Sequence, residues 1–253
     1  MGNLIRGEFY KLRKSKYSIG MILLALLAGF FIFIQFRQAG EINQLRQSDP
    51  VNGVYALTYV FLNIIFEGNF IFVLLCTEFI IKDFKSSCIN KSFTYGYKRN
   101  QVLLSKIVVL MIFFLILEII YGSILVIYVS QKYGFCDVFN LNTILYLFRV
   151  IILGIMYNLA TVSIILMIAI ITKSNFCTLI SPLVLIMIFI FDYVIERYAI
   201  GRAIFYLPYM SGMVAMVNSI PKINIVICIT SSIVTFIITI GGSLLYVKHE
   251  DIK

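Results

Sequence analysis

The residues of this chain whose chemistry fits their surroundings least are two carboxylic acids. Glu67 and Glu118 each lie near the middle of a long apolar segment. An ionisable side chain inside a membrane is costly, and it is by default a candidate for a functional site. Asn63 lies one turn before Glu67 and Tyr59 one turn before Asn63, and Tyr121 lies one turn after Glu118. The candidates for lining a translocation pathway are therefore Asn63, Glu67 and Glu118, together with Arg149, an intramembrane basic residue.

Arg149 supplies a structural alternative for these acids. It is the one basic residue placed inside an apolar segment. A buried ion pair between Arg149 and an acid would fix the packing of two helices. Arg149 also lies close enough to the end of its segment to extend toward lipid headgroups. A lipid-facing charge at mid-span costs about 2.5–3.5 kcal/mol, so we expect the acids, and Arg149 where it pairs with one, to face protein.

Other site chemistry is missing from the sequence. The five cysteines lie in separate segments without metal-ligand spacing, and the only histidine is His249 near the end of the chain, so we expect no metal site. The sequence holds no G-x-x-x-x-G-K-[ST], no H-E-x-x-H and no G-x-S-x-G motif. The chain is therefore predicted not to be an enzyme and not to hydrolyse ATP itself.

The composition indicates what must position these residues. Of the 253 residues, 61% are hydrophobic and 13% charged, with a mean hydropathy of +0.98. A soluble domain carries about 45–50% apolar and about 25% charged residues, so soluble folds and disorder are both excluded. A membrane-spanning helix needs about 20 mostly apolar residues. We therefore predict an all-α membrane protein, a single polytopic domain over 1–253, with six spans at 17–36, 54–81, 102–129, 141–172, 176–195 and 223–247.

Lysine and arginine placement predicts the orientation of these spans. With the N-terminus inside, the inside segments hold fourteen basic residues and the outside segments six. This bias places both termini in the cytoplasm of a multi-pass protein of the cell membrane. Topology and lipid headgroups also account for the net charge of +9, so we expect no nucleic-acid partner.

The first sixteen residues form a candidate interfacial helix. Leu4, Ile5, Phe9 and Leu12 recur at helical spacing among basic residues. This pattern predicts an amphipathic helix lying in the inner membrane interface, with its apolar side in lipid and its basic side toward the headgroups. Glu8 and Lys11 are spaced to pair within the helix. The alternative is a plain basic flank of the first span.

Residues 82–101 form the long loop on the predicted inner side. Ile89, Phe93 and Tyr97 follow one another at intervals of four, which places them on one stripe of a short helix. Gly96 offers a break, and Arg99 follows it before the next span begins. We interpret the loop as a docking element for a cytoplasmic partner, since a solvated connector has little need of its aromatic residues.

The segment 196–222, on the predicted outer side, is unusually apolar for a loop. Pro208 and Gly212 divide it into short pieces. We predict a re-entrant or interfacial hairpin at the membrane surface before the last helix. The alternative, a seventh broken span, would place the basic C-terminal tail outside. Candidates for an outer gate are Tyr206, Tyr209 and Met213.

Together these features resemble the permease subunit of the type-2 ABC exporter family. The resemblance rests on the basic N-terminus LIRGEFYKLRKSK, on the loop DFKSS to SFTYGYKRNQVLLSK, on the apolar outer segment and on the tail YVKHEDIK. Within the loop, Gly96, Arg99, Ser105 and Lys106 stand at the family's positions. The resemblance covers nearly the whole chain.

The resemblance implies a partner that supplies the energy. In this family two permease chains, identical or homologous, assemble with two copies of a separate ATPase that binds ATP and magnesium. The N-terminal helix and the loop after the second span contact that ATPase. Carried onto this sequence, the coupling residues are Phe9, Lys11, Ile89, Phe93, Tyr95, Gly96, Tyr97 and Arg99.

The resemblance leaves the substrate open. Small members with short outer loops often expel peptide antibiotics, as in lantibiotic immunity and bacitracin resistance in bacteria, and others extrude drugs or sodium ions. We favour a peptide antibiotic or another amphipathic compound. The competing hypotheses are an ion-coupled secondary transporter that uses Glu67 and Glu118, and a membrane anchor that does not transport.

Overall fold

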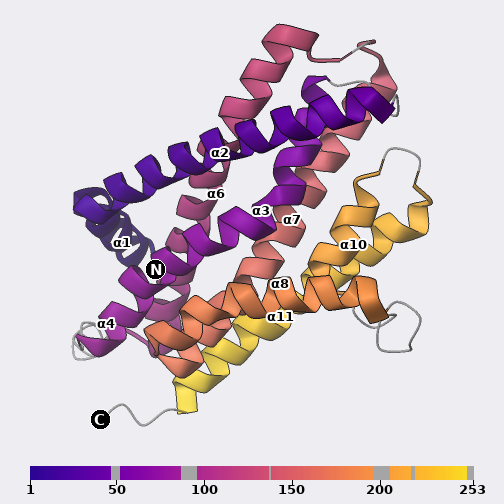
Figure 1. Cartoon of the computed structure of the whole chain (residues 1–253). Coiled ribbons are helices and arrows are strands. Elements are labelled where there is room, and N and C mark those ends of the chain that lie inside the picture. The colour runs from indigo at the N-terminus through magenta and orange to yellow at the C-terminus, as the bar shows by residue number, and fades with distance from the viewer. Residues whose placement is uncertain (47–51, 87–95, 137, 196–205, 218–219, 250–253) are drawn as a thin grey trace.

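The computed structural model describes residues 1–46, 52–86, 96–136, 138–195, 206–217 and 220–249. All regular elements within these ranges are helical (Figure 1). In chain order they are α1 (Gly2–Lys14), α2 (Lys16–Arg46), α3 (Gly53–Cys76), the π-helix η1 (Thr77–Ile81), α4 (Lys82–Lys85), α6 (Arg99–Tyr133), α7 (Leu141–Thr172), α8 (Asn175–Ile195), α10 (Pro208–Ala215) and α11 (Lys222–His249).

Several of these helices are suited by length and composition to cross a membrane. Four of them qualify outright: α2 over Lys16–Gln38, α6, α7 and α11. The stretch Gly53–Ile64 and Glu67–Lys85 makes a fifth if it is one span bent by 50°. The apolar part of α8 described here, Asn175–Ile188, is shorter. The chain is thus an all-helical, multi-pass membrane protein, and the sixth span remains a prediction.

Local signals in the sequence set the ends of these helices. Asn52 caps α3, because its side chain accepts a hydrogen bond from the backbone N–H of Tyr55 at 2.9 Å. Gly134 ends α6 with a φ of 83°, a conformation that suits a residue without Cβ. Lys173 takes the left-handed conformation where α7 ends, and Pro208 starts α10. The boundaries of the long helices therefore follow from short-range chemistry.

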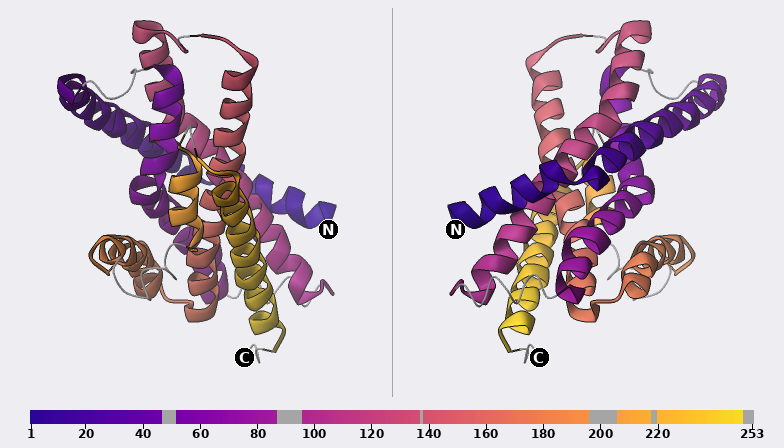
Figure 2. Two further views of the ribbon diagram at one scale, coloured as in Figure 1. Left: turned by 90° about the vertical axis from the view of Figure 1, so that its right-hand side faces the viewer. Right: turned by 90° about the vertical axis from the view of Figure 1, so that its left-hand side faces the viewer.

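Side chains from all parts of the chain build the interior. The rings of Phe72 on α3 and Phe114 on α6 meet edge to face, with centroids 5.2 Å apart. Gly122 on α6 lies against Val60 of α3, where a Cβ would come within 2.8 Å of the valine side chain. Such close approach is typical of helices that pack within a membrane. Figure 2 shows that α2 and α8 run across the bundle of α6, α7 and α11 rather than along it.

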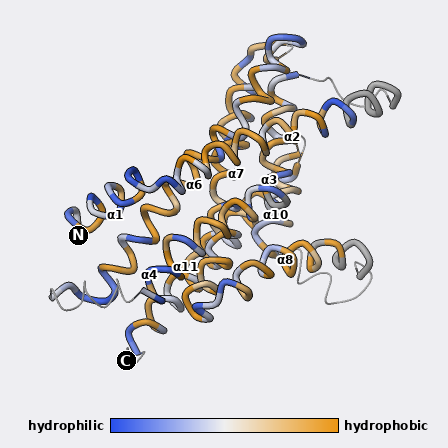
Figure 3. Tube along the Cα trace, turned by 60° about the vertical axis from the view of Figure 1, so that its left-hand side comes forward, coloured by the Kyte–Doolittle hydropathy of each residue, from blue (hydrophilic) through white to orange (hydrophobic). Residues whose placement is uncertain are grey.

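Polar residues gather at the ends of the bundle. In Figure 3 the middle parts of α6, α7 and α11 are hydrophobic, whereas hydrophilic residues lie along α1, in α4 and in the turn between α6 and α7. We call the end that holds α1, α4 and the first turns of α6 the basic end. The N-terminus and the C-terminal end of α11 lie toward it in Figure 1. The predicted topology assigns this end to the cytoplasm.

The N-terminal helix is present as the amphipathic pattern predicts. It is separated from α2 at Ser15, whose backbone is extended. Leu12 is buried, and Ile5 and Phe9 pack against the main core. The apolar side of α1 therefore covers the protein, mainly α6, and does not lie in lipid as the sequence pattern predicted, while Tyr10 on the other side is exposed.

Candidate functional site

Four charged side chains join α1, α4 and α6 at the basic end. We call Glu8, Lys11, Asp83 and Lys106 the charge cluster. The ammonium of Lys106 donates to the carboxylate of Glu8 at 2.7 Å and also to that of Asp83. Lys11 donates to Asp83 from the other side. The cluster thus contains two cations and two anions, and it has no net charge.

The balance of the cluster explains how it can lie partly inside the protein. Asp83 and Lys106 are buried, whereas Glu8 and Lys11 are more exposed. Taking charges out of water is costly, and the cost is offset only where each charge has well-placed partners. Here each of the two buried groups has two partners of opposite sign. The spacing of Glu8 and Lys11, one turn apart on α1, puts both on the face that meets Asp83 and Lys106.

The charge cluster has members at both ends of the predicted coupling loop. Asp83 lies three residues before Ser86, the last described residue before 87–95, and Lys106 lies two turns into α6, which follows the loop. Ile89, Phe93 and Tyr95 fall outside the described residues, so their predicted role is not tested. The cluster therefore connects α1 to the chain on either side of the loop.

The remaining coupling candidates divide into two groups. Phe9 and Lys11 face the protein, because the ring packs on the core and the ammonium pairs with Asp83. Tyr97 is 41% exposed, and Gly96 precedes it with a φ of 82°. Arg99 begins α6. Tyr97 is thus available to a partner, whereas Phe9 and Lys11 hold α1 in place.

A second group of polar residues lies in the middle of the bundle, where α3, α6 and α7 meet. We call Glu67, Tyr121, Glu118 and Asn158 the intramembrane polar layer. The Asn158 side-chain amide donates to Glu118 Oε1 at 2.8 Å. Tyr121 is the polar neighbour of Glu67. Within the described part of the chain, the second oxygens of both carboxyl groups and the Tyr121 hydroxyl are buried without a hydrogen-bond partner.

The intramembrane polar layer confirms that Glu118 faces protein, since the residue is only 7% exposed. Buried polar atoms without partners are rare and call for an explanation, such as a bound group or a catalytic or transport role. Asn63 does not join the layer, because its amide donates to the Tyr59 carbonyl of its own helix at 2.9 Å. The layer therefore has capacity for polar contacts that the described part of the chain does not use.

Arg149 lies with the outer helix α10 rather than with the acid at Glu118. Its guanidinium donates to the Val217 carbonyl at 2.8 Å and stacks over the Tyr146 ring at 5.0 Å. The Tyr146 hydroxyl donates to the carbonyl of Met216, at the C-cap of α10, at 2.9 Å. The alternative in which Arg149 forms an ion pair with Glu118 is therefore wrong, because one oxygen of that carboxyl group accepts from Asn158 and the other has no partner among the described residues.

Two tyrosine hydroxyls, one on α10 and one on α7, donate to backbone carbonyls of α3. Tyr209 is 5% exposed and donates to the Leu62 carbonyl, and Tyr157 of α7 donates to the Phe61 carbonyl, both at 2.7 Å. These carbonyls come just before the 50° bend that follows Ile64. A bend weakens the backbone hydrogen bonds that cross it, and side chains can satisfy the freed carbonyls.

The other gate candidates differ from Tyr209 in their surroundings. Tyr206 is exposed, and Met213 is half-buried against the cluster that contains Tyr157. Gly212 lies so close to the Tyr157 ring that a Cβ would clash with it. Residues 196–205, the first part of the predicted hairpin, lie outside the described residues. The structure therefore places α10 against α7 and α11, and the Tyr209 hydroxyl connects it to α3.

Sequence reasoning missed some members of these groups. Asn158, Tyr157 and the pairing partners of Lys106 were not identified as site residues. The available signal was an amide in the middle of a span, since such a side chain seeks a partner on another helix. Among the described residues, no three His, Cys, Asp or Glu side chains gather as a metal ion requires.

A comparison with known families matches the part of the chain that carries both groups. The model of the family described as ABC-2 family transporter protein matches residues 4–192. This range contains α1 to α7, the charge cluster and the intramembrane polar layer. No curated protein and no solved structure gives a significant match.

Proposed function

Because the chain belongs to the ABC-2 family of transporter proteins, we propose that it is the permease of an exporter that removes a peptide antibiotic or another amphipathic compound from the membrane or the cell. Members of the family provide the membrane-spanning part of an ABC transporter, and the ATPase is a separate subunit. The exporter would give its host immunity or resistance. We place it in the cell membrane of a bacterium.

The charge cluster is the observation that carries this proposal. A permease whose energy comes from another subunit must pass a displacement from its docking surface to its spans. The cluster joins α1 to α4 and to α6, and thus to both sides of the predicted coupling loop. Because the ion pairs join these three helices, a movement of the loop would displace α1, α4 and α6 as one unit. The exposed Tyr97 ring would be part of the surface that the ATPase contacts.

The complete exporter, in this proposal, contains two copies of the ATPase with bound ATP and magnesium. It also contains a second permease chain, identical or homologous. One side of α11 carries exposed apolar residues that suit either lipid or this second chain: Val226, Ile233, Val234, Ile237, Ile238 and Leu245.

The surroundings of α10 support an amphipathic substrate. A small crevice of about 30 Å³ lies between α7, α8 and α10. Its lining is mainly apolar, with Thr161 and the Tyr209 ring among the residues that contribute to it. The intramembrane polar layer lies elsewhere along the same bundle. A substrate with an apolar and a polar side would find contacts of both kinds.

The intramembrane polar layer favours a second candidate function, the extrusion of a monovalent cation such as sodium. Three buried oxygens of Glu67, Glu118 and Tyr121 have no hydrogen-bond partner in the described parts of the chain. Carboxyl, hydroxyl and amide oxygens are suitable ligands for hard cations. The same acids would serve an ion-coupled secondary transporter, which would work without an ATPase.

One experiment separates these functions. The chain is expressed with the ATPase encoded beside it in a sensitive bacterium, and growth is measured against a lantibiotic, bacitracin, an unrelated drug and high sodium. We expect increased resistance to a peptide antibiotic that disappears with a catalytically inactive ATPase. Tolerance of sodium alone would favour the second candidate. Transport that persists with the inactive ATPase would overturn the ABC mechanism.

A further inference from the structure

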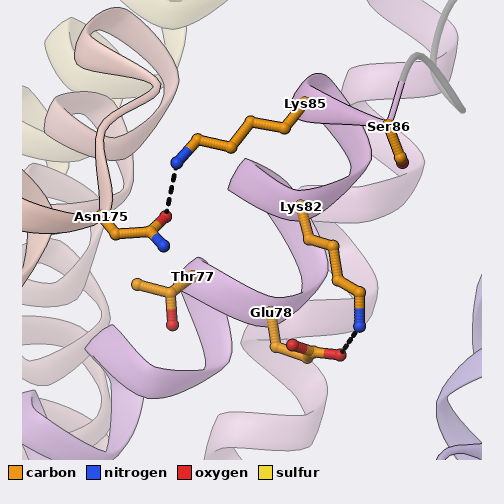
Figure 4. A pocket seen from close by; sticks show the side chains of 6 residues that line it. All are labelled: Thr77, Glu78, Lys82, Lys85, Ser86 and Asn175. Carbon is orange, nitrogen blue, oxygen red and sulfur yellow. Dashed lines mark hydrogen bonds and ion pairs between the residues drawn. The ribbon is translucent and has the colours of Figure 1, made fainter.

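A polar pocket opens at the basic end, and none of the four residues of the charge cluster lines it. It lies between the segment η1–α4 and the start of α8, and its volume is about 410 Å³. Figure 4 shows the Lys85 side chain reaching across it toward Asn175. We call it the headgroup pocket, and its lining consists of Thr77, Glu78, Lys82, Lys85, Ser86 and Asn175.

The pocket carries one positive charge in excess. Lys82 is paired with Glu78 one turn before it (Figure 4). Lys85 instead contacts the neutral amide oxygen of Asn175, at 3.4 Å. No acidic partner of Lys85 occurs among the residues described. An ammonium group with hydroxyl and amide groups nearby is suited to bind a singly charged phosphate.

The surface beside the pocket is apolar. Helix α8 begins at Asn175, and its next residue, Phe176, is 72% exposed. Leu179 and Leu183 are also exposed and follow at intervals of three and four, so they share one helix face with Phe176. A ligand with its phosphate on Lys85 would have this apolar face next to the rest of its structure.

We infer that the headgroup pocket binds the phosphate of an anionic phospholipid, with the acyl chains along the exposed face of α8. Basic pockets between membrane helices on the cytoplasmic side commonly bind acidic headgroups. Free phosphate has the same charge chemistry, but it would make no use of Phe176 and Leu179. The inference does not depend on which substrate the permease moves.

The test measures binding of phosphatidylglycerol to the purified chain in a neutral detergent. Addition of this lipid should raise the melting temperature, whereas phosphatidylcholine and inorganic phosphate should not. Lys85→Gln should lower the affinity for phosphatidylglycerol, measured from the lipid concentration that gives half of the melting-temperature increase, about fivefold. This change corresponds to about 1 kcal/mol for one basic residue at a membrane surface. Lys98→Gln removes an exposed lysine of the same end outside the pocket, and it should bind phosphatidylglycerol like the parent protein.

Three results would overturn the inference. Lys85→Gln could retain the parent affinity for phosphatidylglycerol, inorganic phosphate could stabilise the protein equally, or phosphatidylcholine could act as well as the acidic lipid. A fourth result would also overturn it. If Lys85→Gln left lipid binding unchanged but reduced co-purification of the ATPase, the pocket would be a protein-docking site. A second variant, Phe176→Ser, should weaken binding of phosphatidylglycerol with long chains more than binding of its short-chain analogue.

Discussion

Lys106 and Asp83 form an ion pair in which each side chain is only 5% exposed. Each has a second partner on α1, Glu8 for the lysine and Lys11 for the aspartate. Helix α1 is therefore attached to the bundle by charges as well as by its apolar side. This attachment connects the predicted interfacial helix to the segment that leads into the predicted coupling loop.

The Lys106–Asp83 pair can be tested by removing one or both partners. We expect Lys106→Met to lower the free energy of unfolding by about 3 kcal/mol, the lower end for breaking a buried pair, because Lys11 still faces Asp83. The double variant Lys106→Met/Asp83→Leu should recover most of this loss, since no buried charge is left. Denaturant titration in mixed micelles measures both.

The control for this experiment is the exposed pair of Lys82 and Glu78. Lys82→Met should change stability little, because exposed ion pairs contribute little. A loss from Lys106→Met no larger than that from Lys82→Met would contradict the structural role of the cluster.

If the coupling loop docks on the ATPase, removing its aromatic side chains should weaken that binding. Phe93→Ala/Tyr97→Ala should leave membrane insertion intact, weaken co-purification of the ATPase and abolish transport or resistance. Buried aromatic anchors each cost about 2 kcal/mol or more when truncated. Tyr133→Ala, which removes an exposed ring at the other end of α6, should have none of these effects. Full ATPase association and activity in the double variant would refute the docking role.

Two substitutions of Glu118 test whether its charge or its hydrogen bond with Asn158 stabilises the protein. Glu118→Gln keeps an oxygen that accepts from Asn158, so we expect its stability to equal that of the parent protein. Glu118→Ala leaves the buried amide without an acceptor and should cost about 1–3 kcal/mol. Thermal unfolding in detergent measures both variants. Equal losses in the two would show that the ionised carboxylate, rather than the hydrogen bond, stabilises the layer.

Tyr209 tests how α10 is anchored. Tyr209→Phe removes the hydroxyl that donates to the Leu62 carbonyl, and we expect a loss of about 1 kcal/mol. Tyr10→Phe changes an exposed ring of α1 and should be neutral. Melting temperatures of the purified variants provide the comparison. An unchanged melting temperature for Tyr209→Phe would mean that packing alone holds α10.

Surface labelling tests the exposure of α10 in the membrane. A cysteine at Met213 should react slowly with a charged maleimide, because this side chain is half-buried against the Tyr157 cluster. A cysteine at the exposed Val217 should react rapidly and provides the reference. Both are measured in a background without the native cysteines. Rapid labelling at Met213 would show instead that α10 moves away from the bundle.

Much of the helical framework could be predicted because its signals are local. The predicted spans 102–129 and 141–172 correspond to α6 at Arg99–Tyr133 and α7 at Leu141–Thr172. Apolar length and the residues at helix ends are properties of neighbouring positions, so they can be read in order along the chain. The family resemblance rested on the same linear order of features, and the family match over 4–192 agrees with it.

The bend of α3 and its consequences could not be predicted in this way. The sequence indicated one continuous span over 54–81, whereas the structure has a 50° bend after Ile64 and the π-helix η1 at Thr77–Ile81. Tyr209 and Tyr157 satisfy carbonyls at that bend from other helices. Their roles depend on where α7 and α10 contact α3. The hydrophobic periodicity of a single helix does not predict these contacts.

The pairing of the polar residues has the same physical origin. Glu67, Glu118 and Lys11 were recognisable from their positions in single helices. Their partners were not, since Asn158 lies 40 residues from Glu118 and Lys106 lies 98 residues from Glu8. A helix must place its apolar stretch in the membrane whatever its neighbours are, so composition is enough to identify it. A buried polar group needs one particular partner within hydrogen-bond distance, and only the packing of helices in three dimensions selects it.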